Sequence, residues 1–137
     1  MITMNKINYE GLKPKQQENY NFHKISSVLA EYGYSCVRLS DDWNGADFLA
    51  LHISGGNDLK VQLKGRLAFD KKYMGKNLHV AFRDGSDWFL YPHDEVLEQL
   101  ISNGIMTGTK SWEIKGNYHF PSLSPKIREI MRDYLLP

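Results

Sequence analysis

The sequence predicts an α/β sandwich in which helices flank a mixed central sheet. Apolar residues recur at helical spacing over residues 13–32, and two turn-rich hairpins of strand-like segments follow them. Shorter helical segments stand after the second hairpin and at the end of the chain. Helices and strands in this order bury their apolar sides by packing the helices onto the faces of one sheet.

The composition predicts a single domain over residues 1–137, with a core at about 14–103 and a C-terminal irregular segment and helix at 104–137. The chain has 137 residues, 42% of them hydrophobic, and a net charge of +1, which suits one hydrophobic core. No apolar run approaches the ~20 residues of a membrane span, and no secretory signal is present, so we expect no membrane partner and a cytoplasmic location. A lone cysteine, Cys36, argues against a disulfide framework or a zinc site.

The first half of the chain contains one predicted helix and three predicted strands. The helix covers residues 13–32, with Pro14 in its first turn and Gly33 at its C-terminal cap. Strands are predicted at 34–39, 46–53 and 59–64. The polar residues 40–42 would close the first strand, and the glycine-rich residues 54–58 would join the other two as a hairpin.

The second half adds one hairpin and two helices. The basic segment 66–77 is expected to form a loop or one short helix. Strands at 78–82 and 88–91 flank Asp84-Gly85, a step that favours a hairpin turn. A helix is expected at 94–102, followed by irregular chain with short strands at 105–123. Ser124-Pro125 is typical of a helix start and begins the last helix.

Glu18 occupies an unusual place on the first helix. At about 100° per residue it falls within the same arc as Phe22, Ile25 and Leu29, whereas Glu31 falls on the opposite side and should face water. A carboxylate in an apolar stripe is costly unless a metal, a cation or several hydrogen bonds receive it. The alternative is that the stripe ends before Glu18, whose charge then only favours the positive end of the helix.

Asp47 and the segment 60–64 form a second group of polar residues. Asp47 enters an otherwise apolar strand, where aspartate is disfavoured, unless it is a loop residue bonded to the turn before it. In the next strand, alternation places Lys60, Gln62 and Lys64 on one face. Pairing of the two strands across their hairpin would bring an Asp, a Gln and a Lys together.

Oxygen donors in this arrangement suit Mg²⁺, or Mn²⁺ in its place. Mg²⁺ binds one or two carboxylates and keeps several waters, so the Asp47 carboxylate, the Gln62 amide oxygen and the Leu63 backbone carbonyl are candidate ligands. Lys64 would orient the attacking water or neutralise charge on phosphoryl oxygens. Glu18 would hold a metal-bound water or a second metal from the helix above.

This order of residues resembles the PD-(D/E)xK nuclease superfamily, in its Gln-x-Lys variant. The matching residues are a helix glutamate, Glu18, then Asp47 in Gly-Ala-Asp, and Gln62 and Lys64 in Gln-Leu-Lys; Ala46 replaces the family's proline and Gln62 its second acid. The resemblance implies an αβββαβ, restriction-endonuclease-like core and metal-dependent hydrolysis of DNA phosphodiesters, as in restriction, resolvase or homing endonucleases. Cutting both strands would require a homodimer of so small a chain.

Charge is segregated along the chain in spite of the neutral total. Residues 60–83 carry seven basic side chains against one acid, and such a block is where a phosphate backbone would lie. The candidate DNA-binding residues in or beside it are Lys60, Arg66, Lys71, Lys72, Lys76 and Trp43. Trp43 would stack on a base or cover the end of the sheet.

Two alternatives to an active nuclease follow from the same residues. One is a catalytically weak or inactive nuclease-fold module that binds nucleic acid or a protein partner, since Gln62 removes a negative charge from the metal site. The other is an unrelated α/β protein whose polar strand face is only solvated. No glycine-rich phosphate-binding pattern is present, so no nucleotide cofactor is expected.

Overall fold

The structure is a computed structural model that describes residues 2–137, apart from the side chain of Asp42. Its helices are α1 (Pro14–Ala30), α2 (His93–Ser102) and α3 (Pro125–Met131), with short helical turns η1 (Tyr9–Gly11), η2 (Lys71–Tyr73), η3 (Ser111–Lys115) and η4 (Arg132–Tyr134). Its strands are β1 (Tyr34–Trp43), β2 (Ala46–His52), β3 (Leu59–Lys64), β4 (Ala68–Asp70), β5 (Leu78–Asp84), β6 (Asp87–Pro92), β7 (Asn117–His119) and β8 (Leu135–Leu136). No helix within these residues is both long and apolar enough to cross a membrane.

Within residues 2–137, six strands form one mixed sheet in the order β1-β2-β3-β5-β6-β8. β1, β2 and β3 are an antiparallel meander, β3 runs parallel to β5, and β5, β6 and β8 are again antiparallel. The small strands β4 and β7 pair separately. The predicted mixed α/β sandwich is confirmed.

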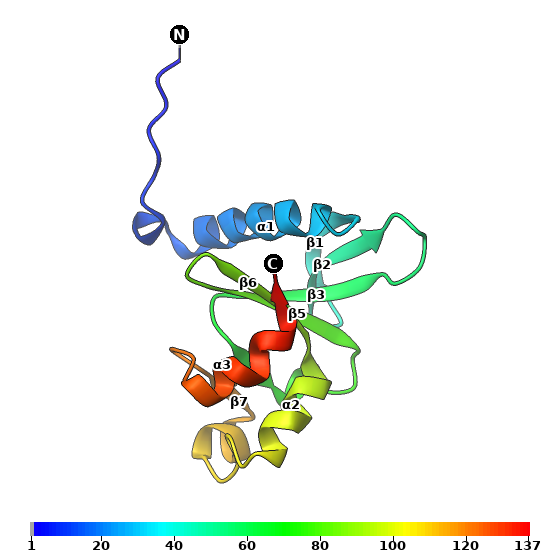
Figure 1. The fold of residues 1–137 in the computed structure, drawn as a ribbon, viewed down its shortest axis with the longest axis vertical. Coiled ribbons are helices and arrows are strands. Elements are labelled where there is room, and N and C mark those ends of the chain that lie inside the picture. The colour runs from blue at the N-terminus through cyan, green and yellow to red at the C-terminus, as the bar shows by residue number, and fades with distance from the viewer. Residues whose placement is uncertain (1) are drawn as a thin grey trace.

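Helix α1 covers one face of the sheet (Figure 1). Its buried residues Phe22, Ile25 and Leu29 pack against Phe48 of β2 and Val61 of β3 in one apolar cluster. These are the helical positions that the periodicity predicted to be buried, and exposed Glu31 confirms the orientation of the helix. Burial of this stripe against alternate strand residues fixes which side of β2 and β3 faces away from the helix.

The other face is covered over β5 and β6 by α2, α3 and the β4–β7 pair (Figure 1). Its core includes Val80, Phe82, Phe89 and Tyr91 from these strands. The hydroxyl of fully buried Tyr91 donates to the Ala68 carbonyl at 2.6 Å, which ties β6 to β4. The same face of β1 and β2 has less cover, so Val37 and Leu51 stay partly exposed.

The predicted end of the first strand is wrong. β1 continues through residues 40–42 to Trp43, which pairs with Ala46. The reversal occurs at Asn44 (φ 53°) and Gly45 (φ 87°), and an Asn-Gly step with two positive φ values suits the twist of a hairpin. A Cβ on Gly45 would lie 2.7 Å from the Leu78 side chain, so glycine is required there by space as well as by φ.

The crossover between parallel β3 and β5 also departs from expectation. The αβββαβ pattern places a helix at 66–77, and the alternative was a loop; the structure has β4 and the single 3-10 turn η2. Thirteen residues between β3 and β5 are enough for a crossover. Fully buried His93 anchors this segment, because its Nε2 accepts the Asp70 amide hydrogen at 3.2 Å and its Nδ1 lies 2.8 Å from Asp94 Oδ1.

The C-terminal region follows the prediction in part. Segment 105–123 is irregular with one short strand, β7, and Ser124 caps α3 by accepting the Ile127 amide hydrogen. Two elements were not predicted. These are η1 before α1 and the edge strand β8, which pairs with Trp88 and Phe89 of β6.

Candidate active site

The β2–β3 hairpin places Asp47 beside Gln62, where both line a cavity together with the first turns of α1. Phe48 pairs with Val61, and both are buried under the helix. Asp47 precedes Phe48, and Gln62 follows Val61. Asp47 and Gln62 are therefore neighbours across the antiparallel ladder, and their side chains alternate away from those of Phe48 and Val61. The Asp47 Oδ2 atom accepts the Leu63 amide hydrogen at 2.8 Å. Asp47 is therefore a strand residue of β2 whose carboxylate is hydrogen-bonded to β3.

A cavity of about 270 Å³ gathers the four residues that the sequence analysis selected. Glu18 from α1, Asp47 from β2, and Gln62 and Lys64 from β3 all line it. Its other lining residues are Tyr9, Pro14, Gln17, Asn21, Leu63 and Gly65. The structure thus brings the predicted catalytic set to one opening between the start of α1 and the end of β3.

Glu18 is received by a cation from β1. The Arg38 Nη2 atom lies 2.9 Å from Glu18 Oε1, and Lys15 Nζ lies 3.8 Å from the same oxygen. The Arg38 guanidinium also sits 5.2 Å from the centre of the Phe22 ring and donates to Asn19. The buried residues of α1 begin at Asn21, so the stripe ends before Glu18, and its carboxylate is stabilised by this cation and by water. The Glu18 side chain remains 43% exposed toward the cavity.

Gln62 and Leu63 supply uncharged oxygens next to Asp47. The Gln62 Nε2 atom lies 3.5 Å from the Leu63 carbonyl oxygen. Across residues 2–137, no three His, Cys, Asp or Glu side chains gather in a metal-binding cluster. The available donors are two carboxylates, one amide and one carbonyl, and this oxygen set fits a hard cation such as Mg²⁺ or Mn²⁺ rather than zinc.

Lys64 lies where positive charge accumulates. Its Nζ atom is 5.5 Å from the centre of the Tyr73 ring, which is itself buried. The pKa of His119 is lowered, first by burial and then by the positive charges of Lys64 and Arg66. The end of β3 is therefore an electropositive edge of the cavity, which favours a phosphate ligand.

Two of the predicted DNA-binding residues near β3 contact each other. Lys60 Nζ donates to the Lys76 backbone carbonyl at 2.6 Å and lies 5.8 Å from the centre of the Trp43 ring. Trp43 is 52% exposed at the end of β1, so it lies open to a ligand and is not buried under the sheet.

The remaining basic residues follow the crossover away from the cavity. Lys71 Nζ lies 5.1 Å from the Trp112 ring centre, and Lys72 Nζ lies 3.9 Å from Asp70 Oδ2. Arg66 lines a neighbouring cavity. None of the predicted DNA-binding side chains lines the 270 Å³ cavity, so this part of the prediction describes a surrounding surface and not the site itself.

Among the residues at or beside the cavity that the sequence did not predict are Arg38, Asn21 and Tyr9, which contribute side-chain contacts. Arg38 carried a signal, because strand alternation places it on the same face as Tyr34 and Cys36, which pack under α1. A cation at this position can form an ion pair with a carboxylate on the facing side of the helix. Asn21 and Tyr9, which are hydrogen-bonded to each other at 2.8 Å, carried none, since they meet through the unpredicted turn η1.

Fold and site together define a mixed α/β domain with a carboxylate-amide-lysine cavity at one end of its sheet. Among solved structures, the chain is similar to the Holliday junction resolvase Hjc of Archaeoglobus fulgidus, at 13% identity and TM-score 0.43 over 54% of this chain and 76% of that one. It is also similar to the bacterial homing endonuclease I-Ssp6803I, at 12% identity and TM-score 0.48 over 83% of this chain and 79% of that one. No protein-family model and no curated protein sequence matches the chain.

Proposed function

We propose that this protein is a metal-dependent endonuclease that hydrolyses DNA phosphodiester bonds. The observation that carries the proposal is the single cavity lined by Glu18, Asp47, Gln62 and Lys64. This cavity combines oxygen ligands suited to a hard cation with a lysine at its electropositive edge. Phosphodiester hydrolysis needs both, because negative charge develops on the phosphoryl oxygens as water attacks.

Each residue has a distinct task in this proposal. Asp47, with the Gln62 amide oxygen and the Leu63 carbonyl, would hold Mg²⁺ or Mn²⁺, which supplies Lewis-acid activation of water and phosphate. Glu18 would accept a hydrogen bond from a water in the cavity while Arg38 holds its carboxylate in place. Lys64 Nζ would donate to a phosphoryl oxygen or to the attacking water.

Cleavage of plasmid, linear, methylated and four-way-junction DNA with Mg²⁺ or Mn²⁺ tests the proposal. We expect nicked or linear products from the wild type and at least a 100-fold slower reaction from Lys64→Ala, the scale of losing one transition-state donor. Lys126→Ala, an exposed lysine on α3, is the matched control and should cut normally. No cleavage of any of these substrates, or full activity in Lys64→Ala, would refute the proposal.

A catalytically weak nuclease-fold module is the second candidate, and Gln62 is the residue that favours it. The amide stands where a carboxylate would bind a divalent cation more strongly, and the nearby Glu18 is already paired with Arg38. If the wild type binds DNA without cutting it while Gln62→Glu cuts, the protein is a binding module with a weakened metal site.

Cutting both strands of a duplex also calls for two such cavities. We propose that the active form is a homodimer bound to DNA. Sedimentation velocity with and without a duplex measures this directly, and a strictly monomeric complex that nicks only one strand would contradict it.

A further inference from the structure

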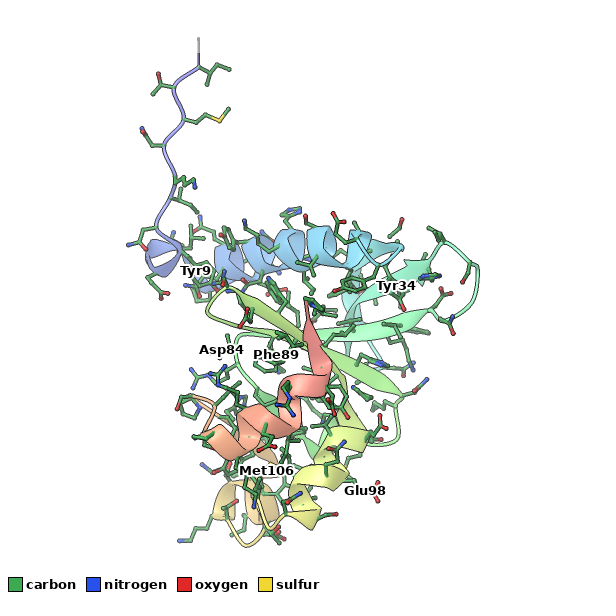
Figure 2. All side chains as sticks on the ribbon, in the orientation of Figure 1. Tyr9, Tyr34, Asp84, Phe89, Glu98 and Met106 are labelled. Atoms are coloured by element: carbon green, nitrogen blue, oxygen red, sulfur yellow. The ribbon has the colours of Figure 1, made fainter. Side chains whose placement is uncertain are left out.

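A second cavity adjoins the candidate active site. It has a volume of about 460 Å³ and lies between η1, the first turns of α1 and the β5–β6 turn. Four residues, Tyr9, Gln17, Asn21 and Gly65, line both cavities. Figure 2 labels Tyr9 where η1 meets this hairpin. A DNA strand bound in the active-site cavity would therefore extend directly into the second cavity.

Asn21 points to a ligand that the protein alone does not supply. Its side chain is buried, with 6% of the residue exposed, and its Nδ2 atom donates to the Tyr9 hydroxyl at 2.8 Å. In residues 2–137, Asn21 Oδ1 is a buried side-chain atom with no hydrogen-bond partner. Turning the amide over would leave Nδ2 unpaired instead. An unpaired buried polar atom costs free energy, so Asn21 Oδ1 calls for a partner such as a water, an ion or a ligand.

Two arginines give the cavity its charge. The Arg83 guanidinium lies 4.4 Å from the centre of the Tyr9 ring and 5.7 Å from that of Tyr20. Neither Arg83 nor Arg66 forms an ion pair within the described part of the chain. Glu10 also lines the cavity, so two positive charges stand against one negative charge.

Stacking on an aromatic face holds a guanidinium plane in position and leaves its N–H edge available. That edge matches the geometry of a phosphate group, which arginine binds through two hydrogen bonds. Lysine in place of Arg83 would keep the charge but lose this preorganisation.

We propose that the second cavity binds one nucleotide of the DNA strand, next to the phosphate that is cut. Arg66 and Arg83 hold the phosphate of that nucleotide, and the Asn21 amide pairs with a polar group of its base or sugar. Its volume lies within the range of roughly 300–1,000 Å³ for small-molecule sites. The inference rests on the proposed nuclease function, because it assigns the cavity to the same substrate strand.

Binding measured without catalysis separates this inference from the proposed function. Fluorescence anisotropy in EDTA, with a labelled duplex and a labelled single strand, gives affinities over a range of salt concentrations. We expect the double variant Arg66→Gln/Arg83→Gln to bind about tenfold more weakly or worse. Its slope of log K against log [salt] should fall by about 0.9 on duplex DNA, the value for one phosphate. The matched variant Lys126→Gln/Arg132→Gln removes the same charge from exposed positions of α3 and η4 and should keep the wild-type slope.

Asn21→Leu is the second arm. It should weaken binding severalfold and leave the salt slope unchanged, because its amide contacts no phosphate. Circular dichroism and thermal unfolding verify that both variants are folded, and Arg83→Lys gives an intermediate affinity in case the double variant unfolds. In the cleavage assay, these changes should raise KM more than they lower kcat.

Three results would overturn the inference. One is a salt slope in the double variant equal to that of the wild type, even if the wild type cuts DNA and Lys64→Ala does not. Another is an absence of oligonucleotide binding by the wild type. The third is a free deoxynucleoside monophosphate that stabilises the protein against thermal unfolding as strongly as the oligonucleotide does, since the cavity would then bind a free nucleotide. Loss of cleavage in Lys64→Ala together with an unchanged slope removes the subsite and leaves the nuclease proposal standing.

Discussion

Replacement of Asp47 by asparagine and by alanine separates the structural role of this side chain from its proposed role in metal binding. Its Oδ2 atom accepts the Leu63 amide hydrogen at 2.8 Å. Alanine leaves that amide without its acceptor in a partly buried place, which costs about 1–3 kcal/mol of unfolding free energy. Asparagine keeps a side-chain oxygen for the same hydrogen bond but has no charge with which to hold a metal ion.

The expected results differ between stability and activity. For a chain of this size, the loss in Asp47→Ala corresponds to a fall in Tm of roughly 4–12 °C, and Asp47→Asn should stay within about 2 °C of the wild type. Both variants should lose at least about 100-fold in DNA cleavage rate. Urea unfolding followed by circular dichroism gives the free energies, and a plasmid nicking assay gives the rates.

Two outcomes would refute this reasoning. Equal stability of the alanine and asparagine variants would show that the bond to Leu63 contributes nothing to the hairpin. Cleavage at the wild-type rate by Asp47→Asn would show that the carboxylate charge is not needed for the reaction. That result would contradict the proposed metal site. Asp133→Asn, the same change at an exposed position of η4, is the control and should alter neither measurement.

Three further predictions follow. Burial lowers the pKa of His93 below its ordinary 6.5. As the pH falls below about 6.5, the unfolded chain therefore takes up more protons than the folded chain, and stability is lost. The free energy of unfolding in urea should differ less between pH 5.5 and pH 7.5 in His93→Gln than in the wild type. Tyr91→Phe leaves the Ala68 carbonyl unpaired in the core and should cost about 1–3 kcal/mol, measured by the same unfolding curves, whereas an unchanged midpoint would contradict the bond. Lys71→Ala/Lys72→Ala should weaken binding to all DNA sequences alike and flatten its salt dependence, and a sequence-dependent loss in anisotropy titrations would argue against a backbone contact.

Local patterns carried most of the fold because they depend on neighbours in the chain. The 3.6-residue period found the buried face of α1, and alternation found the two faces of β3. The four residues of the candidate site came from the same reasoning: Glu18 and Asp47 are polar where their pattern demands an apolar residue, and Gln62 and Lys64 lie on the polar face of the strand that pairs with Asp47. Charged groups out of pattern are informative because burying them requires a partner.

Features made by distant segments were not predictable in this way. β8 consists of two residues, Leu135 and Leu136, and exists only because β6 offers an edge. The Asn21 and Tyr9 pair joins α1 to a turn with no periodic signal. The end of β1 was placed too early because Ser40 and Asp41 are polar, although the Asn-Gly step that marks the real turn stands a few residues later.

The tight turn at Asn44 and Gly45 also fixes the register of β2, and this limits where the chain can be extended by protein engineering. Because strand side chains alternate, one residue inserted between Gly45 and Asp47 would carry the carboxylate to the face beneath α1 and bring Ala46 outward. The loop at the other end of β2 is permissive at Gly56, since a Cβ added there would meet no atom within 4 Å. A reporter group or a short tag inserted there would travel with the hairpin and leave the spacing of the site untouched.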